Sequence, residues 1–444
     1  MRVTHRNRSG AMPVWITLLA LVVGCRTGPP NVILVLVDTL RADHLSAYRY
    51  PRQVSPRIDE FARSATLFES GMAQAPCTIP SVLQIMTSRY VHGSDIDPRV
   101  ATLAETLRAH GYQTAAVVEN ANFEAIRDAH GLVRGFDRFY RNGPLHTDNV
   151  EQQHWKTKTP ADCITAQAVR WLRTRDRDRP FFLWLHYFDP HDPYMPPFAD
   201  DMEALTWQSA SQFTGDIRRT FLYRGDAGER PAEFTAADRQ HLIDLYDAEI
   251  RYLDQSLGEL FDALRSQGLF ERSLIIVAAD HGESFGEHGT WTHGYSLYEP
   301  EVHIPLIVKL PGQTRGRRVP DPVQAIDIAP TVLDVAGIQA DTLGLEGTSL
   351  RQASRKVAFT FWEDAKVVRT VAWKLVTRGE KTQLFRLPND PDELRDLAGE
   401  RPGVVARLTA AGDSKLAALG APPSKVNEVS SQTVERLRAL GYLH

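Results

Sequence analysis

One stretch of the sequence, residues 75–93, combines the features of an anion-binding loop with those of a helix start. Pro80 suits the first position of a helix, and apolar residues at positions 82, 83, 85 and 86 would form its buried face. Free N–H groups and the positive end of the dipole at a helix N-terminus favour an anion such as a phosphate or sulfate ester. The stretch therefore predicts a loop that carries a nucleophile into an anion site. A threonine that only caps a core helix is the alternative.

Two apolar segments end in residues that bind metal ions. Residues 31–37 are almost all apolar and rich in β-branched side chains, which is typical of a buried strand in a parallel sheet, and Asp38 follows them. Residues 273–279 repeat this pattern and lead into Asp280 and His281. Ligands bind at the carboxyl ends of strands in open α/β sheets, so Asp38 is the natural first metal ligand.

The segment around Thr78 resembles the signature of the sulfatase family, which belongs to the alkaline phosphatase superfamily. That signature is Cys-x-Pro-Ser-Arg, four residues, then Thr-Gly-Arg, and residues 80–81 and 87–89 align on it without gaps. The alignment puts Thr78 at the position of the nucleophile. Cys77 lies one residue too early and Val82 replaces the arginine. The formylglycine that this family makes from its cysteine is therefore not expected.

A threonine at this position changes the chemistry that the resemblance implies. A formylglycine hydrate releases sulfate when its hemiacetal collapses, whereas a sulfo-threonine has to be hydrolysed at sulfur, and phosphorus accepts a second displacement more readily. Superfamily relatives with a threonine nucleophile are phosphodiesterases, nucleotide pyrophosphatases and phosphotransferases that form a phospho-threonine. The resemblance thus favours a hydrolase or transferase of phosphate esters with Thr78 as nucleophile. A sulfuric ester hydrolase is the alternative, and a catalytically idle binding protein on the same scaffold is the second.

The resemblance also implies the ligands of one divalent metal ion. Asp280 and His281 match its Asp-His-Gly motif, and together with Asp38 and the oxygen of Thr78 they would form a four-ligand site. The family has a second Asp where this chain has Thr39, and fewer carboxylates with one imidazole favour zinc or manganese over calcium or magnesium. In the implied mechanism the metal lowers the pKa of the Thr78 hydroxyl, which attacks the ester in line. A second metal is not expected.

Histidines are the remaining candidates for the site. His191 follows a predicted strand over residues 181–188 and resembles the family histidine that touches the anion. His293 stands where sulfatases commonly have lysine and threonine-dependent phosphoryl transferases have histidine. Both are expected to bind substrate oxygens or to protonate the leaving group. His186 is a less certain substrate-binding neighbour.

The elements that must position these residues predict an α/β fold, similar to alkaline phosphatase and the sulfatases. A large, mostly parallel central sheet flanked by helices is expected over residues 31–340, with an insertion at about 198–235, and a small antiparallel C-terminal subdomain and tail over 341–444. Sequence patterns predict helices over residues 102–110, 161–173 and 235–267 and further strands over 114–119, 357–362, 367–371 and 373–376. The resemblance to the sulfatases implies a further strand over 304–309 and a helix over 404–419.

Residues 1–24 resemble a bacterial lipoprotein signal peptide. Three arginines precede a short apolar run over residues 11–24, and the sequence Val-Val-Gly-Cys over 22–25 resembles a lipobox. Cys25 is then the lipidated residue and residues 25–30 are a tether. These features predict an exported protein, lipid-anchored to a bacterial membrane on the periplasmic or cell-surface side. An uncleaved anchor or an ordinary signal peptide is the alternative.

Composition narrows the partners. The chain has 444 residues and a net charge of −4, and it contains no basic run, so nucleic acid is not an expected partner. The expected substrate is a small-molecule, lipid or glycan ester. With Cys25 assigned to the lipobox, Cys77 and Cys163 remain and are expected to be free thiols.

Overall fold

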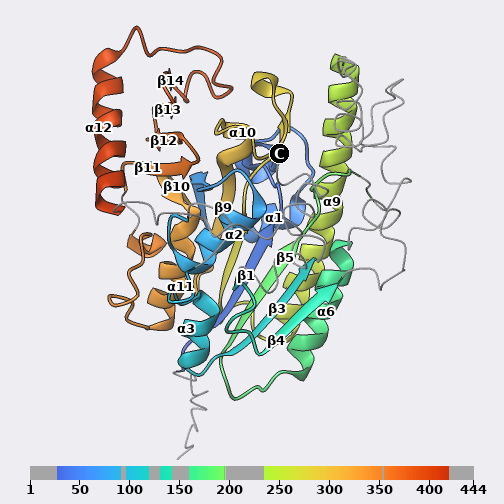
Figure 1. The fold of residues 1–444 in the computed structure, drawn as a ribbon. Helices are drawn as coiled ribbons and strands as arrows, with labels where there is room; N and C mark the ends of the chain where they lie inside the picture. The colour runs from blue at the N-terminus through green and yellow to red at the C-terminus, as the bar shows by residue number, and fades with distance from the viewer. Residues whose placement is uncertain are drawn as a thin grey trace, which may run out of the picture.

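The computed structural model describes residues 28–91, 97–119, 131–142, 160–194, 196, 235–352 and 355–419. Within them an eight-stranded sheet forms the centre, in the order β10-β2-β9-β6-β1-β5-β3-β4 (Figure 1). Its strands are β1 (Asn31–Val37), β2 (Thr66–Met72), β3 (Gln113–Glu119), β4 (Arg138–Asn142), β5 (Phe181–Tyr187), β6 (Ser273–Ala279), β9 (His303–Lys309) and β10 (Arg317–Gln324).

The sheet is mostly parallel, which confirms the predicted fold class. The strands β6, β1, β5, β3 and β4 run parallel to one another, and β10 runs parallel to β2. Only β9 is antiparallel, to both β2 and β6. Sequence patterns did not predict β2, β4 or β10. In β10 the prolines at positions 320 and 322 hide the pattern, and the strand tolerates them because it lies at the edge of the sheet.

Helices cover both faces of the sheet (Figure 1). On one side α6 (Ala161–Thr174) packs against α9 (Ala236–Ser266), which also contacts α1 (Pro56–Ala62). On the other side α2 (Thr78–Thr87) contacts α3 (Leu103–Ala109) and α11 (Ile328–Ala336). The predicted helices over 102–110, 161–173 and 235–267 are confirmed. Thr102 and Thr235 each begin their helix with a capping box, a signal that sequence alone shows.

The register of the central strands sets where their carboxyl ends lie. Val37 of β1 pairs with Ala279 of β6 on one side and with Tyr187 of β5 on the other. The next residues continue this pairing, because the N–H of Asp38 donates to the Tyr187 carbonyl at 2.9 Å. Asp38, Asp280 and the start of the loop after β5 therefore meet at one edge of the sheet.

A second, smaller sheet follows in the chain. Its four antiparallel strands are β11 (Ala358–Trp362), β12 (Ala365–Arg369), β13 (Lys374–Arg378) and β14 (Lys381–Phe385), and α12 (Pro402–Leu419) packs on β12 and β13. Strand β11 contacts β2 and β10 of the large sheet. The predicted antiparallel C-terminal sheet is thus confirmed.

Some predictions fall outside the described residues. The predicted signal peptide with Cys25 lies there, as does nearly all of the predicted insertion over 198–235. Among the helices that the structure describes, none has both the length and the apolar character that a membrane span requires. Cys77 and Cys163 are free thiols, as predicted.

Candidate active site

Two strand ends bring together three buried side chains of types that can bind a metal ion. Asp38 follows β1, and Asp280 and His281 follow β6; all three side chains are inaccessible to solvent. The Nε2 atom of His281 lies 3.5 Å from Asp38 Oδ1 and 3.9 Å from Asp280 Oδ2. His186, on β5, also contacts this cluster, because its Nε2 atom lies 3.5 Å from Asp280 Oδ2.

Helix α2 places Thr78 against this cluster. The Thr78 hydroxyl donates toward Asp38 Oδ1 and Oδ2, at 3.4 Å each, and lies 3.2 Å from His281 Nε2. Thr78 is itself the first residue of the helix, so its side chain and the free N–H groups of the first turn share one end of α2. The hydroxyl is therefore buried between a carboxylate, an imidazole and the positive end of a helix dipole.

Two details of the helix start differ from the sequence prediction. Pro80 was expected at the first helical position, but it occupies the third, because α2 begins two residues earlier. A proline fits there since the N–H groups of a first turn lack helical partners in any case. The capping-threonine alternative is wrong: Cys77 is the N-cap residue, and it makes no side-chain capping hydrogen bond.

The residues around Asp280 fit a divalent cation. Ligand atoms of Asp38, Asp280 and His281 all lie within 4.8 Å of one another. Asp280 Oδ2 is buried and accepts no hydrogen bond within the described part of the chain. His281 Nδ1 lies 2.9 Å from the Gly282 carbonyl, which leaves Nε2 to face the carboxylates. Two carboxylates, an imidazole and a hydroxyl oxygen form a donor set that suits zinc or manganese.

Electrostatics keep these groups in the protonation states that metal binding requires. Burial lowers the pKa of His281 to about 4, and the charge of Asp280 opposes this only in part, so the imidazole is neutral at pH 7. Burial tends to raise the pKa of Asp280, but His281 and His186 outweigh it and hold that pKa below its usual value. The carboxylate is therefore ionised and the imidazole lone pair is free.

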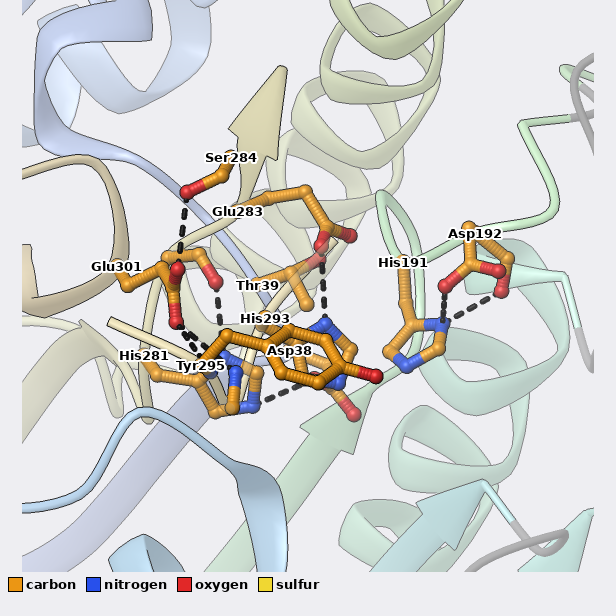
Figure 2. A network of polar contacts seen from close by, with 12 residues as sticks. Asp38, Thr39, His191, Asp192, His281, Glu283, Ser284, His293, Tyr295 and Glu301 are labelled. Atoms are coloured by element: carbon orange, nitrogen blue, oxygen red, sulfur yellow. Dashed lines mark hydrogen bonds and ion pairs between the residues drawn. The ribbon is translucent and has the colours of Figure 1, made fainter. Parts of the chain in front are cut away.

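The predicted histidines line up beside the cluster (Figure 2). The ring of His293 lies 4.6 Å from that of His281 and 4.9 Å from that of His191, measured between centroids. His293 Nδ1 lies 2.9 Å from Glu283 Oε1, and His191 Nδ1 lies 2.5 Å from the Asp192 carbonyl. Both Nδ1 atoms are thus engaged by neighbouring oxygen atoms, which fixes the orientation of the two rings.

The structure therefore brings together most of the residues that the sequence singled out. Thr78, the three metal-binding residues, His191 and His293 share one site, whereas His186 lies against Asp280 on β5. Sequence reasoning missed Glu283 and Asp192 as partners of the two histidines. Asp192 follows His191 directly, but nothing in the sequence pairs Glu283 with a residue ten positions later.

Cys77 is badly placed to serve as the nucleophile. It is half-buried and lies just before α2, outside the Asp38, Asp280 and His281 group. Burial, reinforced by the charge of Asp280, raises the pKa of its thiol well above the usual value. The reactive thiolate is therefore disfavoured at neutral pH.

Comparisons with known proteins agree with the resemblance to the sulfatases. Residues 30–338 match the family described as Sulfatase, and residues 286–410 match the family described as N-sulphoglucosamine sulphohydrolase, C-terminal. Arylsulfatase K of Mus musculus is 26% identical, and the alignment covers 85% of this chain and 78% of that protein. Choline-sulfatase of Rhizobium meliloti (strain 1021) is 25% identical, with coverage of 88% and 87%.

Solved structures share the fold. The phosphonate monoester hydrolase of Agrobacterium radiobacter superposes with a TM-score of 0.67 at 22% identity, covering 88% of this chain and 95% of that one. A protein solved in complex with its substrate D-glucosamine-2-N,6-O-disulfate superposes with a TM-score of 0.69 at 19% identity, covering 90% of this chain and 100% of that one.

Proposed function

The chain belongs to the sulfatase family, and we propose that it hydrolyses sulfuric esters at the site around Thr78. The names of its relatives support this substrate class, because arylsulfatase K and choline-sulfatase are both named as sulfatases. The threonine at position 78 favoured phosphate esters over sulfate esters, whereas the names of the relatives favour sulfate esters. A divalent metal ion at Asp38, Asp280 and His281 is part of the proposal, as is the absence of formylglycine.

The observation that carries the proposal is the buried Thr78 hydroxyl, which lies 3.2 Å from His281 Nε2 and 3.4 Å from both Asp38 oxygens. A metal ion held by these residues would supply positive charge that stabilises an oxyanion and makes the hydroxyl more acidic. Asp38 is placed to accept the Thr78 proton, and the N–H groups that open α2 are placed to bind ester oxygens.

The rest of the reaction follows from the histidines. Attack of Thr78 Oγ1 on sulfur breaks the bond to the leaving alcohol, whose oxygen takes a proton from Nε2 of His293 or His191. Water then gives a proton to the deprotonated imidazole and attacks sulfur in the sulfo-threonine. The departing Thr78 oxygen takes back the proton held by Asp38, which restores the hydroxyl and releases hydrogen sulfate. Glu283 holds Nδ1 of His293, so the proton enters and leaves that ring at Nε2.

Phosphate or phosphonate ester hydrolysis, or transfer to an alcohol, is the second candidate. The specific observation in its favour is the residue itself, because an unmodified threonine suits a second displacement at phosphorus better than one at sulfur. The phosphonate monoester hydrolase among the structural neighbours shows that the fold accommodates such a substrate. The residues and their roles would be the same, with a phospho-threonine as the covalent state.

One comparison of substrates tests both candidates. The purified protein is assayed with nitrophenyl sulfate, nitrophenyl phosphate, a nitrophenyl phosphonate and a nitrophenyl phosphodiester, beside Thr78→Ala and Cys77→Ala. Sulfate turnover lost only in Thr78→Ala supports the proposal, and phosphoester turnover lost in that variant supports the second candidate. Sulfate turnover lost only in Cys77→Ala would overturn the nucleophile assignment. A protein that turns over none of them and binds no metal is the idle scaffold.

The cellular context is a separate proposal that rests on the sequence. We infer export and lipid anchoring through Cys25, with a small-molecule, lipid or glycan ester as substrate. Fractionation of cells that express the wild type and Cys25→Ala tests the anchor: the wild type is expected in the membrane fraction and the variant in the soluble fraction. Equal distribution of the two would exclude lipidation at this residue.

A further inference from the structure

A buried carboxylate next to the site collects an unusual number of donors. Glu301 lies on the short helix α10 (Glu299–Val302) and is inaccessible to solvent. Its Oε2 accepts the consecutive backbone N–H groups of residues 294, 295 and 296, at 2.9, 3.1 and 3.1 Å. Its Oε1 accepts the hydroxyls of Ser284 at 3.0 Å and Ser296 at 2.6 Å (Figure 2). Five donors saturate the lone pairs of one carboxylate.

The segment that Glu301 holds is backbone that needs support. His293 is flanked by Thr292 with φ of 65° and Gly294 with φ of 94°, both in the left-handed region. A β-branched residue is strained in that region and persists there only where surrounding contacts enforce the conformation. The three N–H groups bound by Glu301 belong to the residues immediately after His293, so the carboxylate fixes the backbone that follows the strained Thr292 and His293.

The same carboxylate also reaches the other support of His293. Glu283 fixes the Nδ1 atom of His293, and its neighbour Ser284 donates its hydroxyl to Glu301. Ser284 lies in β7 (Ser284–Phe285), which pairs with β8 (Trp291–Thr292) just before His293. Glu301 therefore ties together both segments that orient the imidazole.

From this network we propose that Glu301 is a positioning residue, which fixes the backbone of residues 294–296 and thereby holds the imidazole of His293 beside that of His281. The inference rests on the proposed function in one respect, namely that His293 acts on the substrate. It adds a residue that touches neither substrate nor metal and whose loss would be felt through another side chain.

Glutamine is the conservative substitution at this position. Its carbonyl oxygen can accept the three backbone N–H groups, while its amide group faces the two hydroxyls, which can accept as well as donate. Burial already raises the pKa of the Glu301 carboxyl to about 7, so a neutral group is compatible with this environment. Glu301→Gln is therefore expected to keep the segment in place, whereas Glu301→Ala removes every bond to it.

Asp254 supplies a matched control. It is also a buried carboxylate that accepts backbone N–H groups, those of Arg57 at 2.9 Å and Ile58 at 2.8 Å. Burial raises its pKa to about 7 as well. It lies on α9 and holds the start of α1, so Asp254→Ala removes the same kind of anchor without touching the segment that carries His293.

The experiment has two readouts. Hydrogen–deuterium exchange of the amides of residues 294–296 reports on the backbone without any turnover. Glu301→Ala is expected to accelerate that exchange, while Glu301→Gln and Asp254→Ala leave it as in the wild type. On the best substrate found, Glu301→Ala is expected to lower kcat, with kcat/KM falling about 10- to 100-fold, as loss of an orienting partner typically does. Glu301→Gln is expected to restore most of this loss.

A double-mutant cycle decides whether the effect passes through His293. Adding Glu301→Ala to His293→Ala is expected to cause no further loss of kcat. Additive losses, or unchanged exchange at residues 294–296 in Glu301→Ala, would overturn the proposal. If Glu301→Ala does not fold, Glu301→Asp, which is one methylene shorter, takes its place with the same expectations. If the wild type turns over no ester, the proposed function fails, and exchange alone still decides whether Glu301 holds the segment.

Discussion

Two buried groups of acidic side chains in this protein differ in what faces them. At the site, Asp38 and Asp280 face imidazoles and the Thr78 hydroxyl. Beside the C-terminal sheet, Glu299 faces Lys374 Nζ at 3.0 Å and Arg369 Nη1 at 2.9 Å, and Glu393 faces the same Lys374 atom at 2.9 Å. The first group meets imidazoles and a hydroxyl, while the second meets lysine and arginine side chains.

The difference separates function from stability. Burying a carboxylate is costly unless opposite charge compensates it, and in the second group Lys374 and Arg369 provide that charge from β13 and β12. In the first group a divalent cation would provide it. A bound cation would thus complete the site, whereas the group around Lys374 has its positive charges within the chain and joins the C-terminal sheet to α10.

The largest effect should come from the residue that makes the first group reactive. Thr78→Ala removes the attacking oxygen and is expected to lower kcat by about 10⁴-fold, the scale seen when a nucleophile is lost. The melting temperature should change little, because the substitution removes only a hydroxyl and a methyl group and leaves the carboxylates of the site in place. Steady-state kinetics and thermal unfolding test this, with Cys77→Ala expected to keep its activity. Wild-type activity in Thr78→Ala would show that Thr78 is not the nucleophile.

Lys374→Met should show the opposite behaviour. It leaves the buried Glu393 and the partly buried Glu299 without their shared ammonium group, which is expected to lower the free energy of unfolding by about 3–5 kcal/mol. The folded fraction should retain its kcat, because Lys374 lies outside the site. Urea unfolding followed by activity measured at low denaturant checks both points. A variant of wild-type stability would mean that this ion-pair group contributes nothing.

Removal of a bound metal ion should lower the stability of the folded protein because the ion no longer compensates the charges of Asp38 and Asp280. Zinc or manganese at a hundred times its dissociation constant is expected to stabilise the folded protein by about 2.7 kcal/mol, and a chelator should reverse this. In Asp280→Asn the same additions should shift the melting temperature little, because one ligand is lost. Thermal melts with and without chelator, together with metal analysis, make the measurement. An equal metal-induced shift in Asp280→Asn would place the ion elsewhere.

The smallest effect concerns acid sensitivity of the second group. Burial tends to raise the pKa of Glu299, but Arg369 and Lys374 outweigh it and lower that pKa from 4.5 to about 2. The stability this group contributes is therefore present above pH 4.5 and is lost as the pH falls toward 2. Glu299→Gln cannot titrate, so its stability should fall less steeply than that of the wild type between those values. Unfolding curves across this range test it, and parallel slopes would contradict the assignment.

Local patterns in the sequence were enough to identify the reacting residues. Apolar strands that end in Asp38 and in Asp280-His281 were recognisable because a buried strand needs a continuous run of apolar side chains. The resemblance to the sulfatase signature put Thr78 at the nucleophile position, and the structure places its hydroxyl beside Asp38. Each of these signals lies within a few neighbouring residues, so no knowledge of the fold was needed to find it.

The supports of the site were decided by tertiary structure alone. Glu301 bonds to residues that precede it by five to seven positions, and Glu283 meets His293 only because β7 and β8 pair between them. The edge strand β10 forms despite its prolines because β2 offers it a partner. A carboxylate carries no mark in the sequence of what it will face when buried. The same functional group, a carboxylate, is therefore a candidate metal ligand at Asp280, an ion-pair partner at Glu299 and a backbone anchor at Glu301. The neighbours that the fold brings to each carboxylate decide which of these roles it has.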